Sequence, residues 1–250
     1  MRDPHGLSRL EGLRTILWLL LSMVVIATLL AACATRAPQR LPWEPPLDLT
    51  QPAERASVRQ MVRLRDNPAQ CRALVEAAGA RVSAVPPLAQ GACGHRDALR
   101  FRDGRLGSAQ LTGNADLPLA CPVAAALLLW ERDVVQPAAQ RQLGSRVTRI
   151  EHYGSYACRN IYGTPQGNLS EHARANAIDI AAFRTADGRR ITVLQGWNAD
   201  PASRAFLREV RDGACRLFAT TLSPDYNQAH ADHFHFDQAD RGFWSGAFCR

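Results

Sequence analysis

Two short histidine-bearing segments constrain the fold of this chain more than any other feature. Residues 170–179 read SEHARANAID, and residues 230–237 read HADHFHFD. Together the two segments carry four of the seven histidines in the sequence. A fold that brings them together would concentrate imidazole and carboxylate groups at one place.

The end of the first segment has the alternation of a β-strand. Over residues 176–183 an extended chain places Asp179 on one face and Ile178 and Ile180 on the other. A carboxylate between two isoleucines is at least partly desolvated, which is unfavourable unless a positive group pairs with it. Asp179 is therefore a candidate for pairing with a cation.

The second segment also alternates. An extended chain puts the imidazoles of His233 and His235 on one side and the rings of Phe234 and Phe236 on the other. Two imidazoles and a carboxylate suit a zinc ion, and a catalytic zinc site uses three protein ligands and keeps one position for water. His172 reaches the same place if the loop before the strand folds back.

The order Ser-x-His, six residues, Asp, and later His-x-His resembles the zinc peptidases that cut D-amino-acid peptides in bacterial cell walls. These include D-Ala-D-Ala carboxypeptidases and dipeptidases and murein endopeptidases, and the hedgehog domain shares their fold. The resemblance implies that His172, Asp179 and His235 are zinc ligands. It implies that His233 orients or polarises the site, and that His230 matches a murein endopeptidase histidine and acts as a base, unless it is a loop residue at the rim.

Residues 121–250 resemble the bacterial extensin-like C-terminal family more closely. The matching segments are 156–159 (YACR), 170–173 (SEHA), 214–215 (AC) and 233–235 (HFH). Despite the family name, the chain has no Ser-Pro repeat array, so no structural role in a wall follows.

Four nearby polar residues have two interpretations each. The resemblance implies that Arg159 holds a substrate carboxylate, for which a guanidinium is suited, but a structural salt bridge is the alternative. Ser170 either contacts substrate or caps its loop. Glu171 either orients an imidazole or is a solvated surface acid, and we favour the latter. Asp237 is expected to be a strand-end acid rather than a ligand.

The chain departs from the peptidase pattern at two positions. Ala175 stands where the pattern usually has Gly, so a positive φ there would strain the backbone modestly. The carboxypeptidases and dipeptidases use a Glu base a few residues before His-x-His, whereas residues 226–229 here read YNQA. Asp225 and Asp232 are the only acids close by, so the base is the least defined part of the site.

The N-terminal region has the features of an export signal. Within residues 1–32, three arginines precede an apolar run that is short for a membrane span and suits a signal peptide. The run ends Leu-Ala-Ala-Cys at Cys33, which resembles a lipobox whose Cys becomes lipidated; an uncleaved anchor is the alternative. Because Ala34 follows the Cys, the resemblance implies an outer-membrane lipoprotein that faces the periplasm.

Cysteine usage agrees with an extracytoplasmic protein. Of seven cysteines, Cys33 is set aside for lipid, and no Cys-x-x-Cys pair suggests a zinc cluster. The other six can form three disulfides in an oxidising compartment, and fifteen pairings are possible. These candidates are Cys71, Cys93, Cys121, Cys158, Cys215 and Cys249.

All thirty basic side chains are arginine, and the formal net charge is +7. A mildly basic surface favours adsorption to anionic murein or to phospholipid headgroups. A nucleic-acid role is disfavoured, because the arginines are scattered along the sequence and an exported protein does not meet nucleic acid. The expected partners are peptidoglycan peptides and the membrane, through the lipid on Cys33.

The remaining pattern predicts an α+β fold with an antiparallel sheet flanked by helices and stabilised by disulfides. Residues 33–55 are rich in proline and are expected to be a tether, 56–114 an accessory helical and loop region, and 115–250 the zinc peptidase-like domain. Helices are expected over 58–64, 71–78, 121–134 and 200–218, and strands over 147–153, 176–183 and 191–194.

Overall fold

The structure is a computed structural model that describes residues 5–34, 44–113, 116–242 and 246–250. The chain divides into two units, Met1–Pro46 and Leu47–Arg250. The first contains helix α1 (His5–Ala34), in which the side chain of Cys33 lies outside the described part. Residues 35–43 of the expected tether lie outside the described residues. From Leu47 on, the rest of the expected tether belongs instead to the second unit, because Leu49 is buried in its core and the Leu49 carbonyl accepts from Arg132 at 2.8 Å. Among the residues described, no helix combines the length and apolarity needed to cross a membrane.

Helices of the second unit begin where the sequence supplies caps. Ser57 and Gln60 form a capping box at α2, and the Asn67 side chain accepts from the Gln70 amide at α3. Asp200 accepts from two amides at the start of α7. The helices are α2 (Val58–Arg63), α3 (Pro68–Ala77), α4 (Cys121–Trp130), α5 (Gln136–Leu143), α6 (Val193–Gly196) and α7 (Pro201–Ala214), and η4 (Glu131–Val135) is a π-helical turn that joins α4 to α5.

The strands form a large mixed sheet and two small sheets. Within the described residues the large sheet has eight strands in the order β13-β11-β12-β9-β8-β6-β5, with β10 also paired to β9. A three-stranded sheet has the order β1-β4-β7, and β2 pairs with β3. The strands are β1 (Val82–Ala84), β2 (Leu88–Gln90), β3 (Cys93–His95), β4 (Ala98–Phe101), β5 (Arg105–Leu106), β6 (Ala109–Thr112), β7 (Leu119–Ala120), β8 (Val147–Gly154), β9 (Ala177–Thr185), β10 (Arg190–Thr192), β11 (Thr220–Leu222), β12 (Phe234–Asp237) and β13 (Phe248–Cys249).

The large sheet is not wholly antiparallel, which corrects one expectation. Strand β6 runs parallel to β8, and β13 runs parallel to β11. Parallel neighbours need a crossover connection, and the helical segment α4–η4–α5 lies in the chain between β6 and β8. Strands β5 and β6 come from the expected accessory region, so that region contributes directly to the main sheet.

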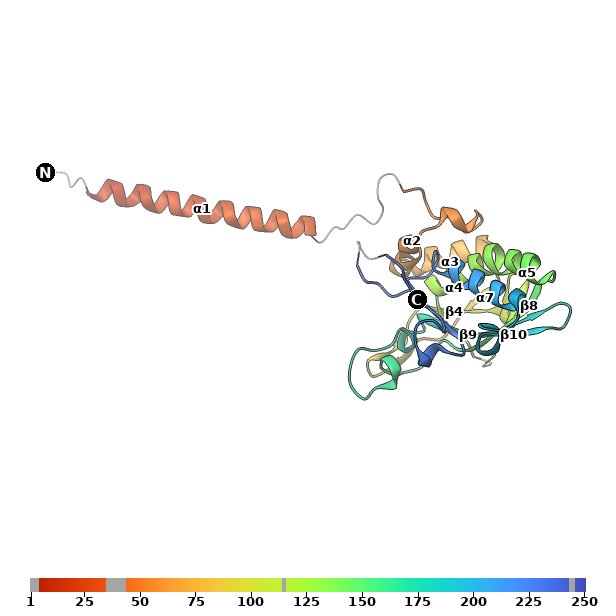
Figure 1. Ribbon diagram of the computed structural model, residues 1–250. Helices are drawn as coiled ribbons and strands as arrows, with labels where there is room; N and C mark the ends of the chain where they lie inside the picture. Colours follow the sequence, from red (N-terminus) through yellow and green to blue (C-terminus); the bar gives the residue numbers. More distant parts are fainter. Residues whose placement is uncertain (1–4, 35–43, 114–115, 243–245) are drawn as a thin grey trace. The chain divides into compact units, whose positions relative to one another are not determined.

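Helices α4, α5 and α7 lie together against the large sheet (Figure 1). The Trp130 ring contacts Phe183 of β9 and Phe236 of β12, and its Nε1 donates to the Val210 carbonyl of α7 at 2.8 Å. Every residue of α4 is buried, because α2 and α3 also pack against this helix. The sheet therefore presents one face to a dry aromatic core.

An irregularity in β9 changes which residues enter this core. Residues Ile178 and Ile180 are buried in it, as the alternation predicts. Strand β9 then has one extra residue, Ala181, relative to β8. Glu151 of β8 pairs with Ala182, and the next residue, His152, pairs with Ile180. Because one inserted residue reverses the faces, Phe183 joins the core.

One predicted strand is shorter than expected. Residues 191–194 were expected to be extended, but β10 ends at Thr192 and α6 begins at Val193. The reason is local, since the Thr192 hydroxyl accepts a hydrogen bond from the Gln195 amide at 3.1 Å and so caps a helical turn.

Three disulfides join the six expected cysteines within the described residues. They are Cys71–Cys121, Cys93–Cys158 and Cys215–Cys249. The first links α3 to the start of α4, the second links strand β3 to the segment before Arg159, and the third holds the tail to the end of α7. Such a set is typical of an extracytoplasmic protein.

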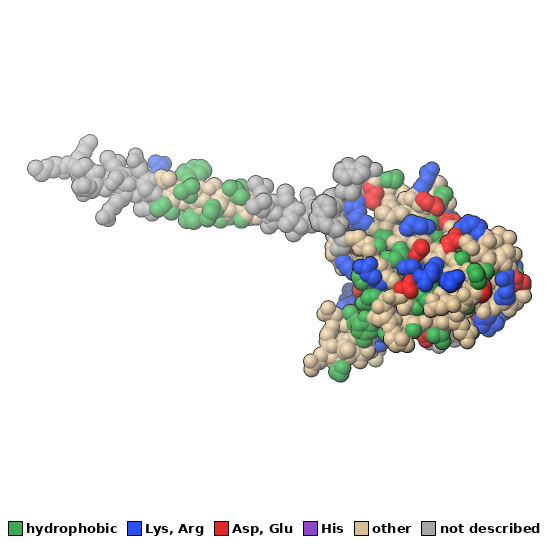
Figure 2. Space-filling view, in the orientation of Figure 1, with side chains coloured by type: hydrophobic (Ala, Val, Ile, Leu, Met, Phe, Trp, Pro, Cys, Tyr) green, Lys and Arg blue, Asp and Glu red, His purple; other side chains and the backbone are tan. Residues whose placement is uncertain are grey.

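Charges on the second unit are mixed. On the face shown in Figure 2, arginines (blue) are interspersed with acidic side chains (red). Glu151, for example, forms ion pairs with Arg184 and Arg190, each at 2.6 Å. The net positive charge is thus spread over the surface shown.

Removal of the Cys71–Cys121 bond should destabilise the domain. We expect Cys71→Ala, Cys121→Ala and the double variant each to lower the free energy of unfolding by about 2–5 kcal/mol, since either substitution releases the same loop. Urea denaturation measures this. Additive losses in the double variant would contradict a single shared bond.

Candidate metal centre

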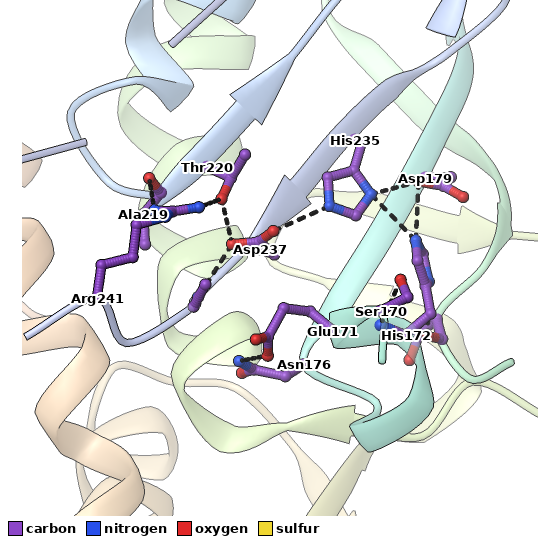
Figure 3. Close-up of polar contacts among 12 residues, drawn as sticks. Ser170, Glu171, His172, Asn176, Asp179, Ala219, Thr220, His235, Asp237 and Arg241 are labelled. Atoms are coloured by element: carbon purple, nitrogen blue, oxygen red, sulfur yellow. Dashed lines mark hydrogen bonds and ion pairs between the residues drawn. The ribbon is translucent and has the colours of Figure 1, made fainter. Parts of the chain in front are cut away.

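Strand pairing brings the two histidine segments together. Strand β12 lies antiparallel to β9, with His235 opposite Asp179 and Phe236 opposite Ile178. Because side chains alternate, Phe236 and Ile178 pack into the core while His235 and Asp179 share the other face. Figure 3 shows these two side chains pointing toward each other.

His172 reaches them from η6 (Glu171–Arg174), a short 3-10 helix that precedes β9. The Ser170 hydroxyl accepts from the His172 amide at 3.3 Å, so Ser170 caps this turn. The turn ends at Ala175, which has φ 54° and ψ 21°. The positive φ agrees with the glycine usual in the resembled peptidases, and it turns the chain from η6 into β9.

Three ligand atoms converge. His172 Nε2 lies 3.2 Å from Asp179 Oδ1 and 3.0 Å from His235 Nδ1. His235 Nδ1 lies 3.0 Å from the same Asp179 oxygen. Tetrahedral ligands bonded at about 2.0–2.2 Å to one zinc ion stand roughly 3.4 Å apart. These residues can therefore hold a metal ion, and they are the group with that capacity in the described part of the chain.

His172 and His235 each form a hydrogen bond on the side of the ring that points away from the other. The two ring nitrogens that face each other are therefore available to an ion. His172 Nδ1 lies 2.8 Å from the Ser155 carbonyl, and His235 Nε2 lies 3.0 Å from Asp237 Oδ2. Both partners accept hydrogen bonds, so each imidazole in its neutral form carries its proton on the outer nitrogen and a lone pair on the inner one. Outer acceptors of this kind orient metal-binding histidines in proteins.

Asp237 thus has a larger role than a strand-end acid. It is buried, and besides His235 it accepts from the Thr220 hydroxyl at 2.5 Å and the Ala239 amide at 2.9 Å. Figure 3 shows this chain of contacts running on to Arg241. The sequence could have indicated this contact through spacing. Asp237 lies two residues after His235, and residues two apart on a strand share a face.

Electrostatic coupling within the group is strong. Burial acts to raise the pKa of Asp179, but hydrogen bonds with His172 and His235 outweigh it and hold that pKa well below its ordinary value. Burial acts to lower the pKa of His235, but Asp179 and Asp237 outweigh it and raise the pKa to about 9. An ion bound at Nδ1 would take the place of that extra proton.

Two further histidines stand beside the group. His233 Nε2 lies 3.6 Å from Asp179 Oδ1, and its Nδ1 bonds Asp232 at 2.8 Å. The ring of His230 lies 5.2 Å from that of His233 and 5.9 Å from that of His235. Burial, followed by the nearby imidazoles, lowers the pKa of His230 to about 4, so the ring is neutral at pH 7.

These side chains line an open cavity of about 700 Å³. Arg159 is exposed in its wall and forms no ion pair or side-chain hydrogen bond with the described residues, so the salt-bridge interpretation is not supported. Ser170 also lines the cavity. Aromatic residues that the sequence did not single out complete the wall, namely Tyr162, Tyr226 and Phe248.

Acids near the site occupy different positions from those expected. Glu171 is partly buried rather than solvated; burial raises its pKa, and the Asn176 amide donates to it at 2.6 Å. Asp225 instead bonds Trp197 Nε1 and Arg208, each at 2.8 Å. Asp232 bonds His233 and the Tyr153 hydroxyl. Neither aspartate lines the cavity.

Taken together, these features define a disulfide-linked α+β domain with a buried His-Asp-His group that can bind a metal ion. Residues 69–250 match the family described as extensin-like protein C-terminus, and the chain belongs to that family. The match begins in α3, earlier than the expected residue 121. A search of curated proteins found no match, and a search of solved structures found none. The relation to D-Ala-D-Ala peptidases and hedgehog domains stays a prediction.

Asp237 should tune metal affinity without being a ligand. We expect Asp237→Asn to weaken binding by about 10–100-fold, because an amide orients the His235 ring less strongly than a carboxylate. Competition with a chromophoric chelator measures the affinity. A loss as complete as that of His235→Ala would instead make Asp237 a direct ligand.

Stability of the metal-free protein should fall in alkaline solution. A pKa raised from 6.5 to about 9 means that His235 stabilises the fold fully below pH 6.5 and loses this contribution as the pH rises through 9. Urea denaturation across that range should show the fall, and His235→Gln should reduce it. An equal fall in the variant would assign it to other groups.

Proposed function

We propose that this protein is an extracytoplasmic zinc-dependent peptidase that acts on the peptides of peptidoglycan. The observation that carries the proposal is the convergence of His172 Nε2, Asp179 Oδ1 and His235 Nδ1 at one wall of a wide cavity. The donor set suits zinc, since two imidazoles and one carboxylate leave a coordination position open. Zinc there would act as a Lewis acid toward a peptide carbonyl and an attacking water.

The other residues of the cavity can perform the proton transfers. His230 is neutral at pH 7 and can accept a proton from water as it adds to the carbonyl, then return that proton to the leaving amine. His233, whose Nδ1 bonds Asp232 and whose Nε2 lies 3.6 Å from Asp179 Oδ1, can stabilise the developing oxyanion. Water and peptide thereby give a carboxylic acid and an amine.

Arg159 supports an anionic peptide as substrate. Its guanidinium is exposed in the cavity wall and pairs with no described acid, so it can form a bidentate contact with a carboxylate. Stem peptides of murein carry free carboxylates. Arg159→Lys should therefore weaken substrate binding more than it slows the chemical step.

A second function is favoured by one observation. No glutamate lies in residues 225–229, and Asp225 is turned toward Trp197 and Arg208. A domain without that base can bind cell-wall peptide or glycan, with or without metal, and not cleave it. This alternative is a non-catalytic envelope lipoprotein.

Metal content and muropeptide release distinguish the two functions. We expect the purified protein to contain about one zinc per chain and to release peptides from murein, and Asp179→Asn to abolish both. Asp187→Asn is the matched control, since Asp187 lies in an exposed turn away from the cavity. Zinc-loaded protein that binds murein but releases nothing would establish the binding function instead.

We also propose that the chain is anchored to the outer membrane by lipid on Cys33, facing the periplasm. The apolar run that ends Leu-Ala-Ala-Cys supports this. Cells fed a labelled fatty acid should incorporate it into the wild type and not into Cys33→Ser. Labelling of the variant would count against lipidation at this residue.

A further inference from the structure

Asn227 joins two parts of the cavity wall. Its Oδ1 lies 2.7 Å from His230 Nδ1, and its Nδ2 donates to the Tyr162 hydroxyl at 3.1 Å. The Tyr162 hydroxyl in turn lies 3.3 Å from that of Tyr226. One amide therefore contacts both the candidate base and the loop that carries Tyr162.

Donor and acceptor rules fix the proton on His230. An amide oxygen only accepts, so the 2.7 Å contact requires a hydrogen on Nδ1. A neutral imidazole with its hydrogen on Nδ1 has a lone pair on Nε2. His230 lines the cavity, and its Nε2 makes no hydrogen bond with the described residues. The basic nitrogen is therefore available to a ligand there.

The structure places the amide oxygen of Asn227 toward His230 and its amide nitrogen toward Tyr162. A flipped Asn227 would present its NH₂ group to His230 Nδ1 and its oxygen to Tyr162, whose hydroxyl could donate to it. Tyr226 lies on the other side of that hydroxyl and can accept its hydrogen. In the orientation that the structure has, the hydrogen bonds run in one direction, from Asn227 to Tyr162 to Tyr226. A flipped amide would reverse that direction and place the hydrogen of His230 on Nε2.

The Tyr162 loop is strained where it meets this amide. Tyr162 has φ 56° and ψ 14° within the turn η5 (Ile161–Gly163), and it is 55% exposed. A bulky side chain seldom adopts this conformation, and such residues cluster at functional sites. Bridge pairing of Asn160 with Leu169 closes the base of the loop. Asn227 therefore links the Tyr162 loop to His230, the candidate catalytic base.

We propose that Asn227 is a positioning residue that holds His230 in the Nδ1–H tautomer and links this state to the Tyr162 loop. The inference rests on the proposed function, because it supplies an orienter for the base in a site that lacks the expected glutamate. Asn227 would act through His230 and would not touch the reacting atoms. Tyr162 would form the substrate-facing end of the same contact chain.

Nitrogen-15 NMR of the histidine rings tests the tautomer in the zinc-loaded full chain, with His230 assigned by comparison with His230→Gln. We expect Nδ1–H in the wild type and in Asn227→Asp, which keeps the acceptor oxygen. Asn227→Leu, similar in size but without an acceptor, should lose this preference while zinc content stays unchanged. Tyr162→Phe should keep the tautomer, since it removes only the loop contact.

A wild type with hydrogen on Nε2 would overturn the proposal, as would an Asn227→Leu spectrum equal to that of the wild type. Loss of zinc in Asn227→Leu together with altered signals of His172 and His235 would show a general structural role and also overturn it. These readouts do not require turnover.

Hydrolysis gives an independent measurement. Where the wild type releases peptides, Asn227→Leu should lower kcat by about 100-fold with little change in KM, because the base is misoriented. Asn227→Asp should restore most of the rate, and Tyr162→Phe should mainly raise KM. A wild type that releases nothing defeats the proposed peptidase activity alone, and the NMR result still decides the role of Asn227.

Discussion

The pairing of β12 with β9 is the contact on which the site depends. In this register Phe234 and Phe236 enter the aromatic core around Trp130, and His235 must then face Asp179. A slip of one residue would bury His235 among aromatic rings and expose two phenylalanines. The hydrophobic core therefore specifies the relative position of His235 and Asp179.

Much of this arrangement can be predicted from local pattern. The alternation over residues 176–180 and 233–236 identifies both strands and the face that carries Asp179 and His235, and two of the expected helices correspond to α3 and α7. The candidate metal-binding group of His172, Asp179 and His235 can be predicted from the residue types and from the resemblance to zinc peptidases. Which residues share a face of one strand or helix can be predicted from a single sequence, because backbone geometry fixes the period at which side chains recur on that face.

What the sequence could not supply depends on long-range contacts. The parallel pairing of β6 with β8 arises from a crossover of more than thirty residues, and the bulge at Ala181 arises from the partner strand. The burial of Glu171 and the pairing of Asp237 with His235 depend on packing around them. The role of Asn227 depends on a loop sixty-five residues away in the chain.

Two of the three disulfides adjoin the walls of the cavity rather than the metal-binding group. Cys158 directly precedes Arg159, and Cys249 directly follows Phe248, whereas His235 and Asp179 stand on paired central strands. A chain held in a reducing environment would lack these two covalent links beside Arg159 and Phe248. The geometry of the cavity wall is in this way tied to a compartment where thiols are oxidised.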